Sequence, residues 1–264
     1  MRAWRRSAKS ALKRILLRYL RLTDQLAGHV PATLFICGHM RSGSTLLHHL
    51  LISHPEIIGC GERQEKYASA EDFDQLRIEA HMRRLSFLRR YRYVSDQVNH
   101  NELFQSPDIL NEDSVRAIFL IRQPQPAVAS MVAVLGRPGR ARPITREMAV
   151  AHYRARLDTL SRYARQIERR TRAFTLTYDE LVDDTLRTLG RLTAFLQLRS
   201  PLTDHYRTFD FTGIRGDPSP AILARRIRRG EPRPSPPGLE ATLLAELDEA
   251  YESCRQVLLR HCTS

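Results

Sequence analysis

Hydrophobic positions along the chain alternate between short apolar runs and long helical repeats. Short, mostly apolar runs cover residues 33–37, 117–121 and 173–178, which is typical of strands buried on both faces of a sheet. Helical repeats, with apolar side chains at steps of three or four residues, cover 146–170, 184–198 and 239–259. Strands that alternate with helices predict an α/β fold with a central, mainly parallel sheet.

A basic amphipathic helix is predicted within residues 1–30. Its apolar positions, at helical spacing among Arg and Lys residues, are Trp4, Ala8, Leu12, Ile15, Leu16 and Tyr19. Packing of this stripe on the rest of the chain is the simpler interpretation, and peripheral contact of residues 1–22 with an anionic membrane is the alternative. The segment lacks the apolar stretch of about 7–15 residues that a secretion signal requires. We therefore expect a cytoplasmic protein, free or held at a membrane surface, in which residues 31–264 form a single domain.

Composition adds a strong positive charge to this picture. The 264 residues carry a formal net charge of +13 with 27% charged residues, and nearly all the basic residues are arginine. Such a field attracts polyanions, for example nucleotides, acidic glycans, anionic lipids or nucleic acid. The four cysteines are scattered without the spacing of a metal site, so we expect them to be reduced and buried, and we expect no metal.

The first predicted strand leads into the sequence GHMRSGST, residues 38–45. Gly38 and Gly43 permit a tight turn before a helix, and backbone N–H groups in such a loop converge on a phosphate at the positive end of the helix dipole. The nucleotide-hydrolysing loop places a lysine after its last glycine. Here Ser44 takes that place and Arg41 is the nearby cation. The loop therefore predicts a P-loop-like three-layer α/β/α fold that binds phosphate but is poorly suited to triphosphate hydrolysis.

A second anion site is predicted where the strand at 117–121 ends. Arg122 follows this strand directly, and its planar guanidinium matches a phosphate dianion. Ser130 lies eight residues further on and could donate a hydroxyl hydrogen to the same anion. Taken alone, a strand-end arginine such as Arg122 is more readily interpreted as the partner of a carboxylate, but the phosphate loop upstream favours the phosphate.

Three segments resemble one known family. RSGSTLLHHLLISHPEIIGCGE (41–62), FLIRQPQPAVAS (119–130) and LTYDELVDDTLRTLGRLTAFLQL (176–198) are similar, in order and spacing, to the recurring blocks of sulfotransferases that use 3′-phosphoadenosine 5′-phosphosulfate (PAPS), particularly the branch that modifies carbohydrates and protein tyrosines. Gln123 replaces the family's Asp, and Pro126 predicts a locally altered helix start. The resemblance implies PAPS as donor, no metal, and sulfuryl transfer to a hydroxyl, or less readily an amine, of the acceptor.

The resemblance also implies roles for individual residues. Arg41 would contact the 5′-phosphate side of the donor and assist the leaving group. The other implied donor contacts are Ser42, Gly43, Ser44 and Thr45 at the 5′-phosphate, Arg122 and Ser130 at the 3′-phosphate, Tyr178 at the adenosine, and Arg215 in the basic loop 211–230. The other arginines of that loop remain equally open candidates.

An acceptor hydroxyl needs a general base beside the sulfur. Glu62 is the first choice, because the resemblance places it where carbohydrate and tyrosyl sulfotransferases carry a catalytic glutamate. Glu65 is a nearby alternative, and His100 is the rival because its segment resembles the one that holds the histidine base of small-molecule sulfotransferases. The histidines at 48, 49 and 54 are interpreted as structural.

The acceptor and two other functions remain open at this level. A glutamate base favours a saccharide, a glycolipid or another hydroxyl-bearing natural product. A nucleotide kinase is disfavoured by the missing lysine. A nucleic-acid-binding protein would suit the basic clusters at 83–93 and 224–230, but these lack a recognition motif, so no nucleic acid partner is expected.

Overall fold

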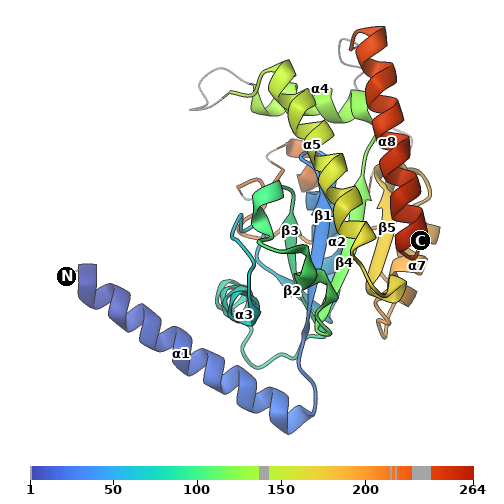
Figure 1. The fold of residues 1–264 in the computed structure, drawn as a ribbon. Coiled ribbons are helices and arrows are strands. Elements are labelled where there is room, and N and C mark those ends of the chain that lie inside the picture. The colour runs from blue at the N-terminus through green and yellow to red at the C-terminus, as the bar shows by residue number, and fades with distance from the viewer. Residues whose placement is uncertain (1, 137–142, 215, 218, 228–238) are drawn as a thin grey trace.

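A five-stranded, fully parallel sheet forms the centre of the molecule (Figure 1). The structure is a computed structural model, and it describes residues 2–136, 143–214, 216–217, 219–227 and 239–264. The strands are β1 (Ala32–Gly38), β2 (Ile57–Gly59), β3 (Tyr93–Val98), β4 (Val115–Ile121) and β5 (Ala173–Thr177), in the spatial order β2-β3-β1-β4-β5. The α-helices are α1 (Arg2–Ala27), α2 (Ser44–Ser53), α3 (Ala70–Arg84), α4 (Pro124–Leu135), α5 (Arg146–Arg165), α6 (Tyr178–Asp183), α7 (Thr185–Phe195) and α8 (Ala241–His261). Short 3-10 helices lie at Asn101–Leu103, Pro107–Asn111, Arg170–Arg172 and Pro220–Ala224.

Both faces of the sheet are buried, which explains the mostly apolar runs in β1, β4 and β5. In β1, Phe35 and Cys37 face the core that α3, α4, α5 and α8 cover, whereas Leu34 and Ile36 face the core that α2, α6 and α7 cover. The predicted α/β fold with helices on both sides of a parallel sheet is therefore confirmed. The four cysteines are buried and free, as expected.

The sequence predicted three of the five strands. The runs at 33–37, 117–121 and 173–178 correspond to β1, β4 and β5, and the helical repeats correspond to α5, α7 and α8. The strands β2 and β3 were not predicted. β2 has only three residues, and β3 carries Ser95, Asp96 and Gln97 in its middle, all of them buried.

Helix α1 corrects one sequence interpretation. Among the predicted stripe residues whose side chains the structure describes, Leu12, Ile15 and Tyr19 are exposed and only Leu16 is partly buried, so these three do not pack on the rest of the chain. The helix instead packs against α3 through another face, on which Leu20 and Asp24 are buried. In the part of the chain that the structure describes, no helix has the length and apolar character needed to cross a bilayer.

The strand order places the loops that follow the strands around one point. β1 is central, and the chain moves from it to β2 and β3 on one side before crossing to β4 and β5 on the other. Open parallel sheets bind ligands beyond the carboxyl ends of their strands, at the position where the chain changes direction. The segments that begin at Gly38, Asn99 and Arg122 meet at this position.

Candidate active site

The loop between β1 and α2 has the backbone of an anion site. Arg41 adopts a positive φ of 65° and Gly43 a φ of 96°, so both lie in the left-handed region that side chains disfavour. Gly43 is the N-cap of α2, and no side chain caps this helix end. Ser44 and Thr45, in the first turn, line the cavity that the helix faces. An uncapped helix N-terminus with unsatisfied N–H groups is an electropositive binding point for phosphate.

Tyr178 closes one wall of this loop. A Cβ atom added to Gly43 would lie 2.4 Å from the Cδ2 of Tyr178, so only glycine fits at this position. The guanidinium of Arg122 stacks on the same ring, with its Cζ 4.0 Å from the ring centroid. The Arg122 side chain also donates to the carbonyl of Arg41 at 3.3 Å. The strand ends of β4 and β5 therefore contact the phosphate loop directly.

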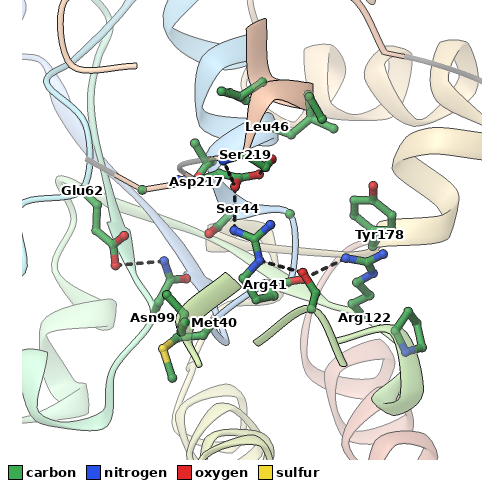
Figure 2. Close-up of a pocket in the computed structure, with 18 of the residues that line it drawn as sticks. Met40, Arg41, Ser44, Leu46, Glu62, Asn99, Arg122, Tyr178, Asp217 and Ser219 are labelled. Atoms are coloured by element: carbon green, nitrogen blue, oxygen red, sulfur yellow. Dashed lines mark hydrogen bonds and ion pairs between the residues drawn. The ribbon is translucent and has the colours of Figure 1, made fainter. Parts of the chain in front are cut away.

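Arg41 lies at the centre of the site and connects three segments (Figure 2). Its Nε donates to the Oγ of Ser130 on α4 at 2.9 Å, and its Nη1 lies 2.7 Å from the Oδ1 of Asp217. Asp217 belongs to the loop before the 3-10 helix at 220–224, and it also accepts hydrogen bonds from the N–H and hydroxyl of Ser219. The sequence assigned Arg41 and Ser130 to different phosphates, whereas the structure joins them in one cluster.

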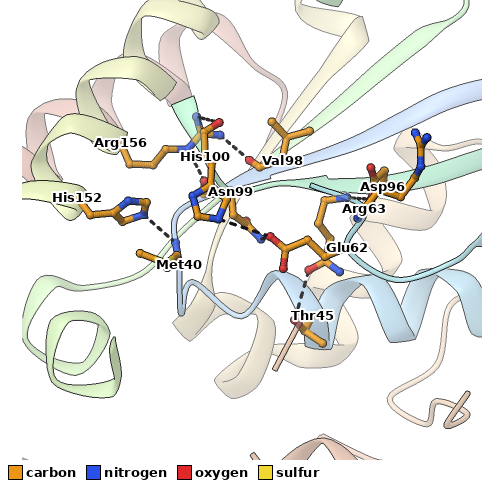
Figure 3. Close-up of polar contacts among 12 residues, drawn as sticks. Met40, Thr45, Glu62, Arg63, Asp96, Val98, Asn99, His100, His152 and Arg156 are labelled. Carbon is orange, nitrogen blue, oxygen red and sulfur yellow. Dashed lines mark hydrogen bonds and ion pairs between the residues drawn. The ribbon is translucent and has the colours of Figure 1, made fainter. Parts of the chain in front are cut away.

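Glu62 lies on the opposite side of the cavity, after β2 (Figures 2 and 3). The amide of Asn99 donates to its Oε1 at 3.2 Å, and the Nε2 of His100 lies 4.0 Å from the same oxygen. Burial raises the pKa of Glu62, although the Asn99 hydrogen bond and the nearby His100 oppose this. A carboxylate that is held by one donor and has a raised pKa is suited to accept a proton.

Buried polar groups fix the segment that carries Glu62. The carboxylate of Asp96 on β3 accepts hydrogen bonds from the N–H of Arg63 at 3.2 Å and from the hydroxyl of Tyr67 at 2.5 Å. The Arg63 side chain donates to the Tyr67 hydroxyl at 3.0 Å and pairs with Glu79 on α3. Burial raises the pKa of Asp96 to about 7, more strongly than these hydrogen bonds lower it. The cluster positions the backbone immediately after Glu62.

Arg156 on α5 fixes the strand ends from the other face (Figure 3). The side chain is fully buried, with 0% of its surface exposed. It donates to the carbonyls of Gly38, Val98 and His100, and to the side chain of Asn101. One guanidinium thus ties the phosphate loop to the end of β3.

A single cavity of about 730 Å³ contains both groups of residues. The predicted site residues that line it are Arg41, Gly43, Ser44, Thr45, Glu62, His100, Arg122, Ser130 and Tyr178. Ser42 is buried, and its hydroxyl lies against Gly38 rather than in the cavity lining. Glu65 is exposed and outside that lining. Arg215 lies outside the described residues. His48, His49 and His54 are buried and hydrogen-bonded within the fold, in agreement with a structural role.

Three polar residues of the site were missed in the sequence. Asn99 follows the strand that was not predicted, so its position at a strand end was hidden. Arg156 carried a usable signal, since it lies on the apolar face of its helix, three residues after Tyr153 and four before Leu160. Asp217 pairs with a residue 176 positions away, and nothing in the local sequence indicates this contact.

The fold and the site together define an α/β protein with a phosphate loop after its first strand and polar residues after all five strands. Residues 31–115, less than half of the chain, match the sequence profile described as the sulfotransferase family. Comparison with curated proteins gives no match.

Solved sulfotransferase structures share the fold. The sulfotransferase domain from the curacin biosynthetic pathway is 16% identical with a TM-score of 0.55, over 88% of this chain and 98% of that one. The sulfotransferase domain from the Synechococcus PCC 7002 olefin synthase is 18% identical with a TM-score of 0.54, over 85% and 95%. Mouse sulfotransferase SULT7A1, solved in complex with PAP, is 13% identical with a TM-score of 0.52, over 87% and 88%. The resemblance to sulfotransferases is thus confirmed, whereas the comparisons support neither a nucleotide kinase nor a nucleic-acid-binding protein.

Proposed function

We propose that this protein transfers a sulfuryl group from PAPS to a hydroxyl group of an acceptor. The observation that carries the proposal is the shared cavity, in which an arginine-lined phosphate loop faces the partly buried carboxylate of Glu62. The match to the sulfotransferase family and the common fold supply the reaction class. A saccharide, a glycolipid or another natural product is the proposed acceptor class, and a cytoplasmic location is proposed with it.

The residues present suit a bisphosphorylated nucleotide. The N-terminal turn of α2, with Gly43, Ser44 and Thr45, would hold the 5′-phosphate by backbone N–H groups and hydroxyls. Arg122 and Ser130 would hold the 3′-phosphate, and Tyr178 would lie beside the nucleoside. Ser42 would support the loop rather than contact the phosphate, because its N–H donates to the carbonyl of His39 at 3.1 Å and its hydroxyl is buried beside Gly38. The donor, when bound, would supply the sulfuryl group whose sulfur–oxygen bond to the phosphate breaks.

Residues on one side of the cavity would then accept the proton of the acceptor, and residues on the other side would stabilise the charge of the leaving group. Glu62 would accept the proton of the acceptor hydroxyl as its oxygen bonds to sulfur, and Asn99 would hold the carboxylate in place. Arg41 would stabilise the negative charge that develops on the departing phosphate. His100, whose ring lies near the same carboxylate oxygen, would contact the acceptor or assist the proton transfer.

Calorimetric titration with adenosine 3′,5′-bisphosphate and with AMP tests the donor site. A hydrogen bond to a charged group contributes about 1.5–3 kcal/mol, so the 3′-phosphate should make the bisphosphate bind about 10–100 times more tightly than AMP. The Arg122→Ala variant should remove most of this difference. Arg187→Ala, which removes an exposed arginine on α7, is the matched control and should leave it unchanged.

Equal affinity of the wild-type protein for both nucleotides, or no binding by the folded protein, would overturn the proposed donor.

A second measurement tests the proposed general base, Glu62. The protein is incubated with sulfur-labelled PAPS and a panel of saccharides, glycolipids and phenols, and sulfated products are detected by mass. Glu62→Gln should retain bisphosphate binding but lose transfer. Transfer at the wild-type rate would exclude Glu62 as the base.

A further inference from the structure

Helix α1 packs on the domain by only part of its surface. Its buried face is centred on Leu20, which is 2% exposed, and on Asp24, which forms a two-pronged ion pair with Arg77 of α3. Lys13 donates to Gln75 of α3 at 3.2 Å. These contacts fix the carboxyl-terminal half of the helix relative to α3. Figure 1 shows that α1 runs outward from the start of β1, past α3, and away from the sheet.

A different face of α1 presents a continuous apolar stripe to solvent. Its residues recur at alternating steps of three and four, and their exposed fractions are high: Leu12 48%, Ile15 64%, Tyr19 38%, Leu22 55% and Leu26 77%. Isolated exposed apolar residues are ordinary on protein surfaces, but contiguous apolar stripes rimmed by polar residues mark interaction sites.

A second segment extends this stripe. The loop after α3 exposes Leu88 to 92%. A cavity of about 130 Å³ between α1 and this loop is lined by Tyr19, Leu20 and Asp24 of α1 together with Leu88, Arg89 and Arg90 of the loop. We call the five exposed apolar α1 residues above plus Leu88 the apolar stripe surface. Two segments that lie about 70 positions apart in the sequence thus contribute to one surface.

The positive charge around this surface favours an anionic partner. Helix α1 contains eight basic residues and one acidic residue, Asp24, which is already paired with Arg77. Arg14 and Arg18 are exposed on α1, and Arg89 and Arg90 are exposed on the loop. A second copy of this chain would bring like charges together, whereas an anionic bilayer offers both an apolar layer and negative headgroups. Amphipathic helices with basic polar faces bind such bilayers at the interface.

We propose that the apolar stripe surface binds the protein peripherally to anionic membranes. The apolar side chains enter the boundary between headgroups and acyl chains, and the surrounding arginines contact the anionic headgroups. This inference does not depend on the proposed enzymatic function, because it rests on α1 and the loop after α3, which lie outside the cavity.

Cosedimentation of the full-length protein with lipid vesicles tests the inference. We expect binding to phosphatidylcholine vesicles that contain phosphatidylglycerol, weaker binding to phosphatidylcholine alone, and a decrease with salt. Burial of one leucine or isoleucine side chain favours binding by about tenfold, so Ile15→Ser and Leu88→Ser should each weaken binding by that order. Arg18→Glu should weaken it at least about fivefold, since each arginine near an anionic surface contributes about 1 kcal/mol.

The controls separate this surface from general effects. Leu186→Ser and Arg187→Glu change exposed residues on α7 and should leave vesicle binding unchanged. All substituted side chains are exposed, so circular dichroism and thermal unfolding should report an intact fold. No vesicle binding by the folded protein would overturn the inference. Loss of binding with Arg18→Glu but not with Ile15→Ser and Leu88→Ser would show electrostatic adsorption only and overturn the role of the apolar side chains. Concentration-dependent dimers that Ile15→Ser abolishes would identify a second copy of the chain as the partner instead.

Discussion

The ion pair between Arg41 and Asp217 predicts a substitution that improves nucleotide binding. Under the proposed function, the donor phosphate and the Asp217 carboxylate compete for the same guanidinium, which now lies 2.7 Å from Asp217. Asp217→Asn removes the negative charge but keeps the shape of the side chain. We therefore expect the variant to bind adenosine 3′,5′-bisphosphate more tightly than the wild-type protein.

The expected magnitude follows from the burial of the pair. Unit charges about 4 Å apart attract by about 4 kcal/mol at an effective dielectric constant of about 20. Solvent reaches both side chains, which are 15% and 21% exposed, so the net contribution is smaller. The asparagine oxygen can still accept a hydrogen bond from Arg41, so part of the interaction persists. A net gain of about 1.4 kcal/mol, or about tenfold in affinity, is the resulting expectation.

Calorimetric titration of both proteins at low and high ionic strength measures this gain. The gain should shrink as salt screens the charges. Ser219→Ala retains the carboxylate and removes one hydrogen bond to it, so it controls for loosening of the loop. Glu246→Gln removes an exposed carboxylate on α8 that does not line the cavity, so it controls for the loss of one negative charge elsewhere in the protein. Unchanged or weaker binding by Asp217→Asn, with both controls at wild-type affinity, would refute the reasoning.

Three further predictions concern the loop, the base and the buried arginine. Gly43→Ala should weaken bisphosphate binding at least about tenfold. The φ of 96° at this position costs a residue with a side chain about 1–2 kcal/mol, and the added Cβ would lie 2.4 Å from Tyr178. Calorimetry measures the effect, and Gly190→Ala, whose added Cβ has no atom within 4 Å, should bind normally. Glu62→Gln should lower the transfer rate about 10²–10⁴-fold. Burial raises the pKa of Glu62, so the wild-type protein loses stability as the pH rises from the pKa of a free glutamate through the higher pKa of Glu62 in the folded protein. The Glu62→Gln variant has no such loss, so it should be the more stable protein at alkaline pH and lose this advantage in acid. Denaturant unfolding at two pH values measures the difference. Arg156→Met should lower the unfolding free energy by about 3 kcal/mol or more, since buried carbonyls would lose their donor; an effect below about 1 kcal/mol would contradict this account.

Sequence patterns predicted the elements whose burial is apolar. The strands β1, β4 and β5 contain short, mostly apolar runs, and the carboxyl ends of β1 and β4 locate Arg41 and Arg122. Tyr178 follows β5, but its role was taken from the family resemblance. The two strands that were not predicted, β2 and β3, are different. β3 is buried although Asp96 and Gln97 lie within it, because Tyr67 and Arg63 satisfy the Asp96 carboxylate from another segment. Local hydrophobicity cannot report a partner supplied by tertiary structure.

The site residues also fall into those that local sequence predicts and those that depend on tertiary structure. Six predicted residues that belong to the glycine loop or directly follow a predicted strand line the cavity, namely Arg41, Gly43, Ser44, Thr45, Arg122 and Tyr178. Glu62, His100 and Ser130 also line it, but the family resemblance was needed to select them. Asn99 and Asp217 required knowledge of which distant segments meet. Ser42 shows a limit of such patterns, since its place in the loop suggested a phosphate contact, whereas its hydroxyl is buried beside Gly38 and its N–H donates to His39. Loop sequence identifies a binding backbone more reliably than the direction of each side chain.

The order of the strands has a consequence for how such a site changes over evolution. β4 and β5 carry Arg122 and Tyr178 on one flank of β1, whereas β2 and β3 lead to Glu62, Asn99 and His100 on the other. Under the proposed function, nucleotide contacts and acceptor contacts are inherited on separate flanks of the sheet. Selection can therefore retarget the enzyme to a new acceptor through the β2–β3 flank while nucleotide recognition stays constant. A chimaera that exchanges residues 57–111 with the equivalent segment of another protein of this fold should change acceptor choice and leave bisphosphate affinity intact.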